Sequence, residues 1–367
     1  MFLYQVLTQV TNLEHPLKVL DLCAAPGGKS TLIHSLLNDQ SFLLVNEVIR
    51  SRIQPLKQNL NKWGNPNLII SNNDPADFEF LKGYFDVVVV DAPCSGEGMF
   101  RKDEKVMAEW NPEQVLVCAS RQNRILDRAA TLVKKGGFLV YSTCTFANEE
   151  NEEQVMRLID KGKWESILID IQPEWGITRT TINEVIGYRF YPHKVKGEGL
   201  FMACIQKTED DKYEEVIGKK LSYLPARQVK AVNHWLANPS QFNFVLGKEQ
   251  IYAIPAFMTD IYARLSNRLS IVQCGFPLGK LAGDNLIPTH ELALSNTLNH
   301  STPCVELDLS NALLYLKKGS LKPDYTWPKG WATANYLGKR LGWIKVMPNR
   351  INNYYPTEWR ILKDIEI

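Results

Sequence analysis

Two cysteines lie directly after apolar runs whose composition is typical of buried strands. Cys94 follows four valines and the segment Asp91-Ala92-Pro93, and Cys144 follows Phe138-Leu139-Val140 and Tyr141-Ser142-Thr143. A thiolate is a strong nucleophile, and a nearby carboxylate such as that of Asp91 can help to move protons. The two thiols are fifty positions apart in the chain. Only the fold could therefore bring them together.

The competing interpretation is that these cysteines are small buried hydrophobic residues, a common fate of free cysteine. An odd number of thiols without a Cys-x-x-Cys pair disfavours zinc and disulfides, so we predict no metal and a reduced, cytoplasmic setting. Cys118, Cys204 and Cys274 lack a polar motif, and we interpret them as packing residues. The cysteines are at positions 23, 94, 118, 144, 204, 274 and 304.

A third segment with chemical potential, DLCAAPGGKS, runs from Asp21 to Ser30. Gly-Lys-Ser is typical of ATP-binding loops, but those loops need a glycine where this chain has Cys23, and the GxGxxG dinucleotide fingerprint is also absent. Small residues still let backbone approach a ligand at a helix N-terminus. Glu47 lies 19 positions after Gly28, where an acid can accept both ribose hydroxyls. A ribose without a phosphate fits S-adenosylmethionine.

The elements that must carry these residues are short apolar runs that alternate with amphipathic segments. We expect strands at 18–22, 43–47, 67–71, 85–91, 137–142 and 200–206, and helices at 2–10, 51–63, 113–134 and 149–159. This alternation predicts an α/β domain, a Rossmann-like doubly wound sheet that is parallel and covered on both faces. Ligands bind at the carboxyl ends of such strands, where both cysteine motifs fall.

The length of 367 residues allows two or three domains, and no run of about 18 apolar residues predicts a membrane helix. No secretion signal is recognisable. The net charge of +2 is uneven, because residues 317–367 hold ten lysines and arginines against four acids. Basic side chains interleaved with aromatic ones suit nucleic acid, but equally a small aromatic core with a basic rim. Those aromatic residues include Trp327, Trp331, Tyr336, Trp343, Tyr354, Tyr355 and Trp359.

Five segments appear in the order and spacing of the Sun-type RNA cytosine-C5 methyltransferases: DLCAAPGGKS, NEVIRSR, NNDPADF, DAPCSGEGMFRKD and YSTCTFANEENEEQV. The chain therefore resembles that family over nearly its whole length. Residues 189–199 are similar to the family's late methyltransferase segment. The tail, with LGWIK and NNYYP, is similar to the PUA-like RNA-binding end of the family's bacterial ribosomal small-subunit members.

The resemblance implies a role for each residue of the two motifs. Cys144 is expected to attack carbon 6 of cytosine, Cys94 to assist release, Asp91 to contact the cytosine edge, and Lys29 to lie close by. The cofactor-binding set is expected to be Cys23, Ala24, Ala25, Pro26, Gly27, Gly28, Lys29, Glu47, Arg52, Asp74 and Asp91. The implied partner is RNA, either 16S rRNA or the small ribosomal subunit. We expect the protein to be a monomer that binds neither a membrane nor a metal ion.

The resemblance also predicts four parts: a catalytic domain over 1–207, a linker over 208–219, an intermediate region over 220–289 and a PUA-like RNA-binding domain over 290–367. For RNA phosphates we expect Lys339, Arg340, Lys345 and Arg350.

The family's N-terminal substrate-binding region is expected to be missing before Met1. Three hypotheses therefore stay open: an active RNA cytosine-C5 methyltransferase, a truncated or inactive RNA-binding relative, and a methyltransferase for protein or small molecules.

Overall fold

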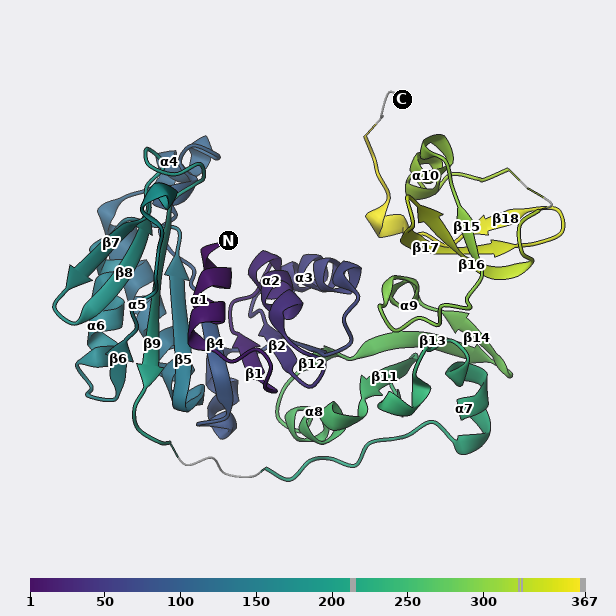
Figure 1. The fold of residues 1–367 in the computed structure, drawn as a ribbon, viewed down its shortest axis with the longest axis horizontal. Coiled ribbons are helices and arrows are strands. Elements are labelled where there is room, and N and C mark those ends of the chain that lie inside the picture. The colour runs from purple at the N-terminus through teal and green to yellow at the C-terminus, as the bar shows by residue number, and fades with distance from the viewer. Residues whose placement is uncertain (212–215, 323, 325, 364–367) are drawn as a thin grey trace. The chain divides into compact units, whose positions relative to one another are not determined.

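The computed structural model describes residues 1–211, 216–322, 324 and 326–363 (Figure 1). The chain forms two compact units. The first comprises Met1–Lys57, Ile69–Lys219 and Arg264–Val272, and the second Gln58–Leu68, Lys220–Ala263 and Gln273–Ile367. Part of the predicted linker, residues 212–215, lies outside the described residues, as do residues 323, 325 and 364–367 of the predicted C-terminal domain.

Within the described residues, a ten-stranded sheet has the order β12-β3-β2-β1-β4-β5-β9-β8-β7, with β6 beside β9. β1 pairs in parallel with β2 and β4, and β4 with β5. This arrangement confirms the Rossmann-like α/β fold. The strands are β1 Lys18–Asp21, β2 Phe42–Asn46, β3 Leu68–Ser71, β4 Phe85–Asp91, β5 Val133–Thr143, β6 Trp164–Ser166, β7 Thr178–Ile182, β8 Val185–Phe190, β9 Leu200–Lys207 and β12 Ile271–Cys274.

The expectation of a fully parallel sheet is wrong for β9. This strand pairs antiparallel with both β5 and β8, and β8 pairs antiparallel with β7. Parallel neighbours need a long crossover, usually through a helix, whereas a short loop, residues 191–199, joins β8 to β9. The chain therefore turns back on itself beside the parallel part of the sheet.

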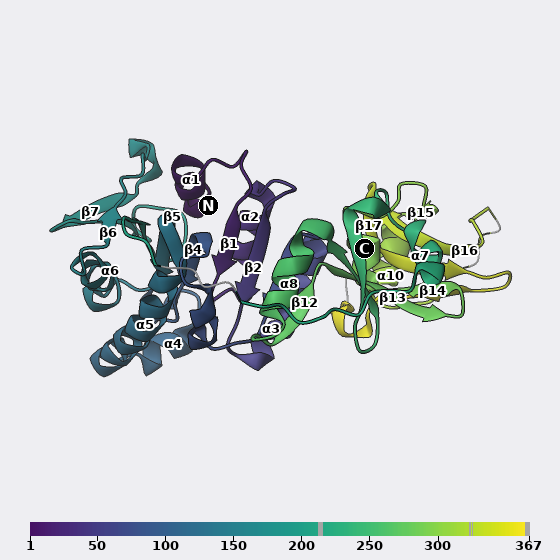
Figure 2. The ribbon, with the colours of Figure 1, turned by 90° about the horizontal axis from the view of Figure 1, so that it is seen from below.

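Helices cover both faces of this sheet. Figure 2 shows α1 and α2 on one side and α5 and α6 on the other. α5 buries Val115, Cys118, Gln122, Ile125 and Ala129, at the spacing of three and four residues that places side chains on one helix face. The helices are α1 Phe2–Val10, α2 Gly28–Leu36, α3 Arg50–Trp63, α4 Glu104–Glu109, α5 Pro112–Leu132 and α6 Glu152–Ile159.

The helix predicted at 149–159 begins later than expected. A 3-10 turn, Asn148–Glu150, comes first, and α6 begins at Glu152. Between them Asn151 has φ −115° and ψ −100°, which is not a helical backbone conformation. The interruption separates the residues after Cys144 from the regular helix, so α6 does not begin directly after that thiol.

The second unit contains two four-stranded sheets, in the orders β10-β11-β13-β14 and β15-β16-β17-β18. Its strands are β10 Phe242–Leu246, β11 Ile251–Pro255, β13 Phe276–Ala282, β14 Asn285–Pro288, β15 Cys304–Glu306, β16 Gly330–Tyr336, β17 Lys339–Val346 and β18 Ile351–Asn353. Its helices are α7 Ala226–Asn233, α9 His290–Leu294 and α10 Leu309–Leu316, and α8 is Thr259–Leu265.

Some aromatic residues of the tail are buried in a core, and others are partly exposed. Trp343 and Tyr355 are buried in the cores of the second unit. Tyr354 is 38% exposed and its ring lies 4.5 Å from that of Trp331, which Lys345 Nζ covers at 5.2 Å from the centroid. These three residues therefore offer a basic aromatic surface above an aromatic core.

Arg340, predicted to contact phosphates, makes a hydrogen bond within the second unit. Its Nη1 donates to the Ser295 carbonyl at 2.7 Å. Across the described residues, none of the helices is both long and apolar enough to cross a membrane, and no group of His, Cys, Asp and Glu in that same part of the chain has the makings of a metal site.

A buried carboxylate ties β1 to α2. Asp21 is fully buried, and its Oδ2 accepts a hydrogen bond from Ser30 Oγ at 2.6 Å. Burial raises the pKa of Asp21 to about 7, against the lowering effect of that hydrogen bond. Within the described structure the other carboxyl oxygen has no hydrogen-bond partner.

We expect Asp21→Asn to remove a pH dependence of stability. The unfolded carboxyl ionises near its ordinary pKa of 3.8, whereas the folded one keeps its proton until about pH 7. Between these values the folded state binds one more proton, so stability falls with rising pH by about 1.4 kcal/mol per pH unit. Asparagine does not titrate and should flatten this slope. Urea unfolding of both proteins between pH 4 and 7.5 measures it, and parallel curves would contradict the assignment.

Candidate active site

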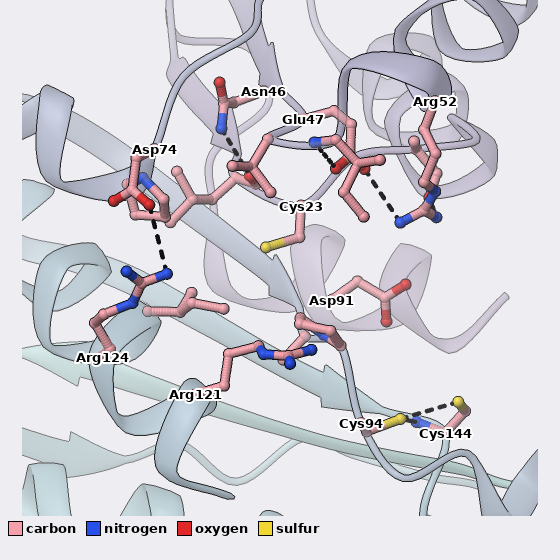
Figure 3. A pocket seen from close by; sticks show the side chains of 18 residues that line it. Cys23, Asn46, Glu47, Arg52, Asp74, Asp91, Cys94, Arg121, Arg124 and Cys144 are labelled. Carbon is pink, nitrogen blue, oxygen red and sulfur yellow. Dashed lines mark hydrogen bonds and ion pairs between the residues drawn. The ribbon is translucent and has the colours of Figure 1, made fainter. Parts of the chain in front are cut away.

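The two motif cysteines meet at the carboxyl ends of β4 and β5. The parallel register places Asp91 opposite Ser142, so the residues that follow each strand leave the sheet side by side. Cys94 Sγ lies 3.0 Å from Cys144 Sγ, and the Cys144 N–H donates to Cys94 Sγ at 3.3 Å (Figure 3). The fold therefore brings together the thiols of Cys94 and Cys144, which lie far apart in the sequence.

The two thiols differ in their affinity for a proton. The hydrogen bond with the Cys94 thiol lowers the pKa of Cys144 and outweighs burial and the charge of Asp91, which raise it, while the Lys29 ammonium also lowers it. The same hydrogen bond, together with burial and the negative charge of Cys144, raises the pKa of Cys94 well above its ordinary value. When the pair holds one proton, the proton therefore stays on Cys94 and Cys144 is the thiolate.

Asp91 is held beside the two thiols by residues from two other elements. Its Oδ2 forms an ion pair with Lys29 Nζ at 2.8 Å, and its Oδ1 accepts from Ser142 Oγ at 2.7 Å. Lys29 stands at the start of α2 and Ser142 near the end of β5. The carboxylate therefore has a fixed direction while about a third of its side chain stays exposed, as a group that contacts a substrate requires.

The loop between β1 and α2 is fixed by backbone contacts. The Ala24 N–H donates to the Asn46 carbonyl at 2.9 Å, and Arg52 Nη2 donates to the Ala25 carbonyl at 2.6 Å. Gly27 precedes α2 with φ 107°, a left-handed conformation that favours glycine. These contacts hold the small residues 23–28 against the sheet edge.

A cavity of about 470 Å³ opens in front of this loop. Glu47, Asp74 and Asp91 bring carboxylates to it from the ends of β2, β3 and β4. Glu47 is 3% exposed; its Oε1 accepts from the Ile49 N–H at 2.8 Å and its Oε2 lies 3.3 Å from Arg52 Nη1. A fixed carboxylate on the wall of an otherwise mainly apolar cavity suits the two hydroxyls of a ribose, so these residues fit a nucleoside cofactor.

The predicted residues do not all reach this cavity. Cys23, Ala25, Glu47, Arg52, Asp74, Asp91, Cys94 and Cys144 line it, whereas Ala24, Pro26, Gly27, Gly28 and Lys29 do not.

Sequence reasoning missed Asn46, Ile49, Arg121, Arg124 and Ile125, which also line the cavity. Three of them come from the middle of α5, Pro112–Leu132, and no local sequence signal marks them as site residues. Arg124 Nη2 lies 3.4 Å from Asp74 Oδ2.

A second cavity, of about 880 Å³, lies among α1, the residues 174–177 and the loop between β8 and β9. Trp175 and Phe190 offer aromatic surface there, and Lys194 and Lys196 offer positive charge. Lys29 lines this cavity and pairs with Asp91, which lines the first one. The Lys29–Asp91 ion pair thus joins the two cavities.

Two protein-family models match the chain. The model described as 16S rRNA methyltransferase RsmB/F matches residues 8–206, and the model described as methyltransferase RsmF PUA domain matches residues 302–361. The second match supports the PUA-like C-terminal domain that the resemblance implied.

Curated relatives extend over almost the whole chain. The chain is similar to the ribosomal RNA small subunit methyltransferase F proteins of Aeromonas hydrophila, with 30% identity, and of Aeromonas salmonicida, with 29%. Each similarity covers 93% of this chain and 73% of the relative.

Among solved structures, that of PH0851 is similar with a TM-score of 0.50 and 24% identity, covering 56% of this chain and 45% of that one. The structure of NSun6 from Pyrococcus horikoshii with SFG has a TM-score of 0.49 and 30% identity, covering 56% and 52%.

We expect iodoacetamide to label Cys144 at lower pH than Cys94, because the thiolate is the reactive form and the pKa of Cys144 is lowered while that of Cys94 is raised. In Cys94→Ala the hydrogen bond to Cys144 is lost, so the midpoint of Cys144 labelling should move to higher pH. Peptide mapping by mass spectrometry measures both thiols, with the exposed Cys304 as reference. Labelling of Cys94 at lower pH than Cys144 would contradict the assignment of Cys144 as the thiol with the lower pKa.

Proposed function

Because the chain belongs to the RsmB/F family of 16S rRNA methyltransferases, we propose that it methylates carbon 5 of a cytosine in small-subunit rRNA. The observation that carries this proposal is the 3.0 Å contact between Cys94 and Cys144 beside Asp91. Carbon 5 of cytosine is too weak a nucleophile to accept a methyl group unaided, and a thiolate that adds to carbon 6 removes this obstacle. One thiolate, one thiol and one carboxylate are the groups that this chemistry uses.

S-adenosylmethionine supplies the methyl group when it is bound. We assign it to the 470 Å³ cavity, with Glu47 accepting the ribose hydroxyls and with Cys23, Ala25, Arg52 and Asp74 around it. The backbone contacts of Ala24 and Ala25 keep the loop open towards this cavity. Glu47 is already aligned by the Ile49 N–H and Arg52, so it does not have to reorganise on binding.

Cys144 is the nucleophile in this proposal. Its sulfur forms the bond to carbon 6, the ring electrons move towards N3, and N3 takes up a proton from solvent at the edge that faces Asp91. Carbon 5 then takes the methyl group, and N3 returns its added proton to solvent as the C4–N3 double bond is restored. In the release step the S–C6 bond breaks and Cys94 gives its proton to the departing Cys144 sulfur, 3.0 Å away. The Cys94 thiolate formed in this way takes the carbon 5 proton, and the electron pair of that C–H bond restores the C5–C6 double bond.

The second cavity suits the RNA chain on the other side of the Lys29–Asp91 pair. Aromatic surface stacks on bases and lysines attract phosphates, which is the combination that single-stranded nucleic acid needs. The target base must leave any helix to reach two thiols. In the second unit, Trp331, Tyr354 and Lys345 offer a further surface of the same chemistry, which we assign to RNA recruitment by the PUA domain.

We expect Glu47→Ala to weaken S-adenosylmethionine binding by about 1–3 kcal/mol, because two ribose hydroxyls lose their acceptor. Glu47→Gln keeps one acceptor oxygen and should lose less. Calorimetric titration measures both, with Glu165→Ala, an exposed glutamate of β6, as the matched control. Equal affinity of Glu47→Ala and the control would place the ribose elsewhere.

The two cysteine variants should fail in different ways. Cys144→Ala removes the nucleophile, so neither methylated RNA nor a protein–RNA adduct should form. Cys94→Ala leaves attack and methyl transfer possible but slows release, so a covalent adduct should accumulate. A denaturing gel with labelled small-subunit rRNA, before and after ribonuclease, separates these results. An adduct in Cys144→Ala but not in Cys94→Ala would exchange the roles, and methylation without either thiol would exclude the covalent mechanism.

A further inference from the structure

Two glutamates cross-link the segments that carry the catalytic cysteines. Glu97, three residues after Cys94, accepts from Thr145 Oγ1 at 2.9 Å and from the Phe146 N–H at 2.6 Å. Glu150, six residues after Cys144, accepts from the Ser95 N–H at 3.0 Å. Each carboxylate therefore belongs to the segment of one cysteine and binds the segment of the other.

Glu150 and Gln122 of α5 together form hydrogen bonds with the peptide groups on both sides of Cys94. The Ser95 N–H, which follows Cys94 directly, donates to Glu150 Oε2. Gln122 Nε2 donates to that same oxygen at 2.7 Å and to the Pro93 carbonyl, which precedes Cys94 directly, at 3.0 Å. Both peptide groups that flank the Cys94 side chain are therefore held by one pair of buried side chains.

The burial of the Glu150 side chain lowers the stability of the folded protein. Its side chain is completely buried, and burial raises its pKa, with the neighbouring charge of Glu97 acting in the same direction. Replacing buried polar groups by well-packed apolar ones is often neutral or stabilising. A carboxylate kept at this place, with its hydrogen bonds directed at the peptides around one thiol, indicates a requirement for the position of that thiol.

Cys144 depends much less on Glu150. The Cys144 carbonyl accepts from the Gly98 N–H at 2.7 Å, and the next carbonyl, of Thr145, accepts from Asn151 Nδ2 at 3.0 Å. Glu150 binds this strand through its backbone carbonyl, which accepts from Tyr141 Oη at 2.6 Å and survives a side-chain substitution. Loss of the Glu150 carboxylate should therefore free Cys94 and leave Cys144 in place.

We infer that Glu150 is a positioning residue for the release step: its carboxylate, shared with Gln122, holds the Cys94 thiol against the sulfur of Cys144. This inference rests on the proposed function, since it takes the roles of the two cysteines from there. Without the carboxylate, attack by Cys144 proceeds, but the proton exchange with Cys94 that frees the RNA does not.

The test compares Glu150→Ala, Glu150→Gln and Cys94→Ala in the full chain with labelled small-subunit rRNA. Glu150→Ala should lower turnover about 10- to 100-fold, as expected for the loss of hydrogen bonds to a charged group. It should also accumulate the ribonuclease-sensitive adduct. Glu150→Gln keeps an acceptor for the Ser95 N–H and should recover most of the turnover. The double variant Glu150→Ala/Cys94→Ala should accumulate no more adduct than Cys94→Ala alone.

Glu152→Gln is the matched control, because Glu152 is a glutamate of similar burial that pairs with Arg189 and not with the Cys94 segment. It should lose stability without accumulating adduct. Iodoacetamide labelling gives a readout without RNA: the labelling rate of Cys94 should change in Glu150→Ala, and the midpoint of Cys144 labelling should move to higher pH, as in Cys94→Ala, because the hydrogen bond between the two thiols is lost. If Glu150→Ala does not fold, Gln122→Ala, which removes the Pro93 contact, takes its place.

Adduct in Cys94→Ala but none in a folded, slow Glu150→Ala would overturn the inference and leave the proposed function intact. Adduct in neither variant would show that Cys94 does not serve release, and both the proposed role and the inference would fall. Unchanged Cys94 labelling in Glu150→Ala would also overturn the inference, because the thiol would then hold its position without the carboxylate.

Discussion

The parallel pairing of β4 with β5 is the constraint on which the site depends. Because Asp91 stands opposite Ser142, the two strands end at the same level and their loops leave the sheet together. A shift by one residue would turn every side chain of a strand to the other face. The buried valines of β4 hold this strand in the core with both faces covered, and the irregularity in its pairing with β5 lies at the start of the strand, between Phe85 and Val87. The core thus determines the 3.0 Å distance between two thiols that are fifty residues apart in the chain.

This dependence explains what could be predicted from sequence. The apolar runs that end in Asp91-Ala92-Pro93-Cys94 and Ser142-Thr143-Cys144 are local signals that can be read from the sequence. The rule that ligands bind at the carboxyl ends of parallel strands then predicts that the two motifs meet at one site. Gln122 and Arg124 carry no such signal: they reach the site because α5 crosses the ends of the strands. The direction of β9 was also missed, because strand composition does not record whether a hairpin or a helix leads into it.

The surroundings of each sulfur determine which of the two thiols keeps a shared proton. The hydrogen bond between the two thiols lowers the pKa of Cys144 and raises that of Cys94, and burial raises the pKa of Cys94 further. Lys29 also lowers the pKa of Cys144, against a larger opposing effect of the Asp91 charge. Lys29 is also the residue that binds Asp91 and lies at the boundary of the two cavities. The Lys29 ammonium therefore acts on Cys144 and on the Asp91 carboxylate at once, and its ion pair with Asp91 joins the two cavities. Its place at the start of α2 depends on the left-handed turn at Gly27.

The antiparallel return of β9 completes the site from a third direction. Gly199, at the start of this strand, donates to the Gly98 carbonyl at 3.4 Å, and Gly98 in turn donates to the Cys144 carbonyl at 2.7 Å. A Cβ atom at Gly98 would lie 2.7 Å from both the Cys144 and the Gly199 oxygens, and one at Gly199 would lie 2.3 Å from the ring of Phe146. No side chain fits between these backbones. The loop of each cysteine is therefore packed against β9 as closely as backbone allows, and an alanine at Gly98 would displace the Cys144 carbonyl directly. A strand parallel to β5 would bring its carboxyl end here, so the reversal of direction is what places Gly199, directly before β9, beside the segments of Cys94 and Cys144.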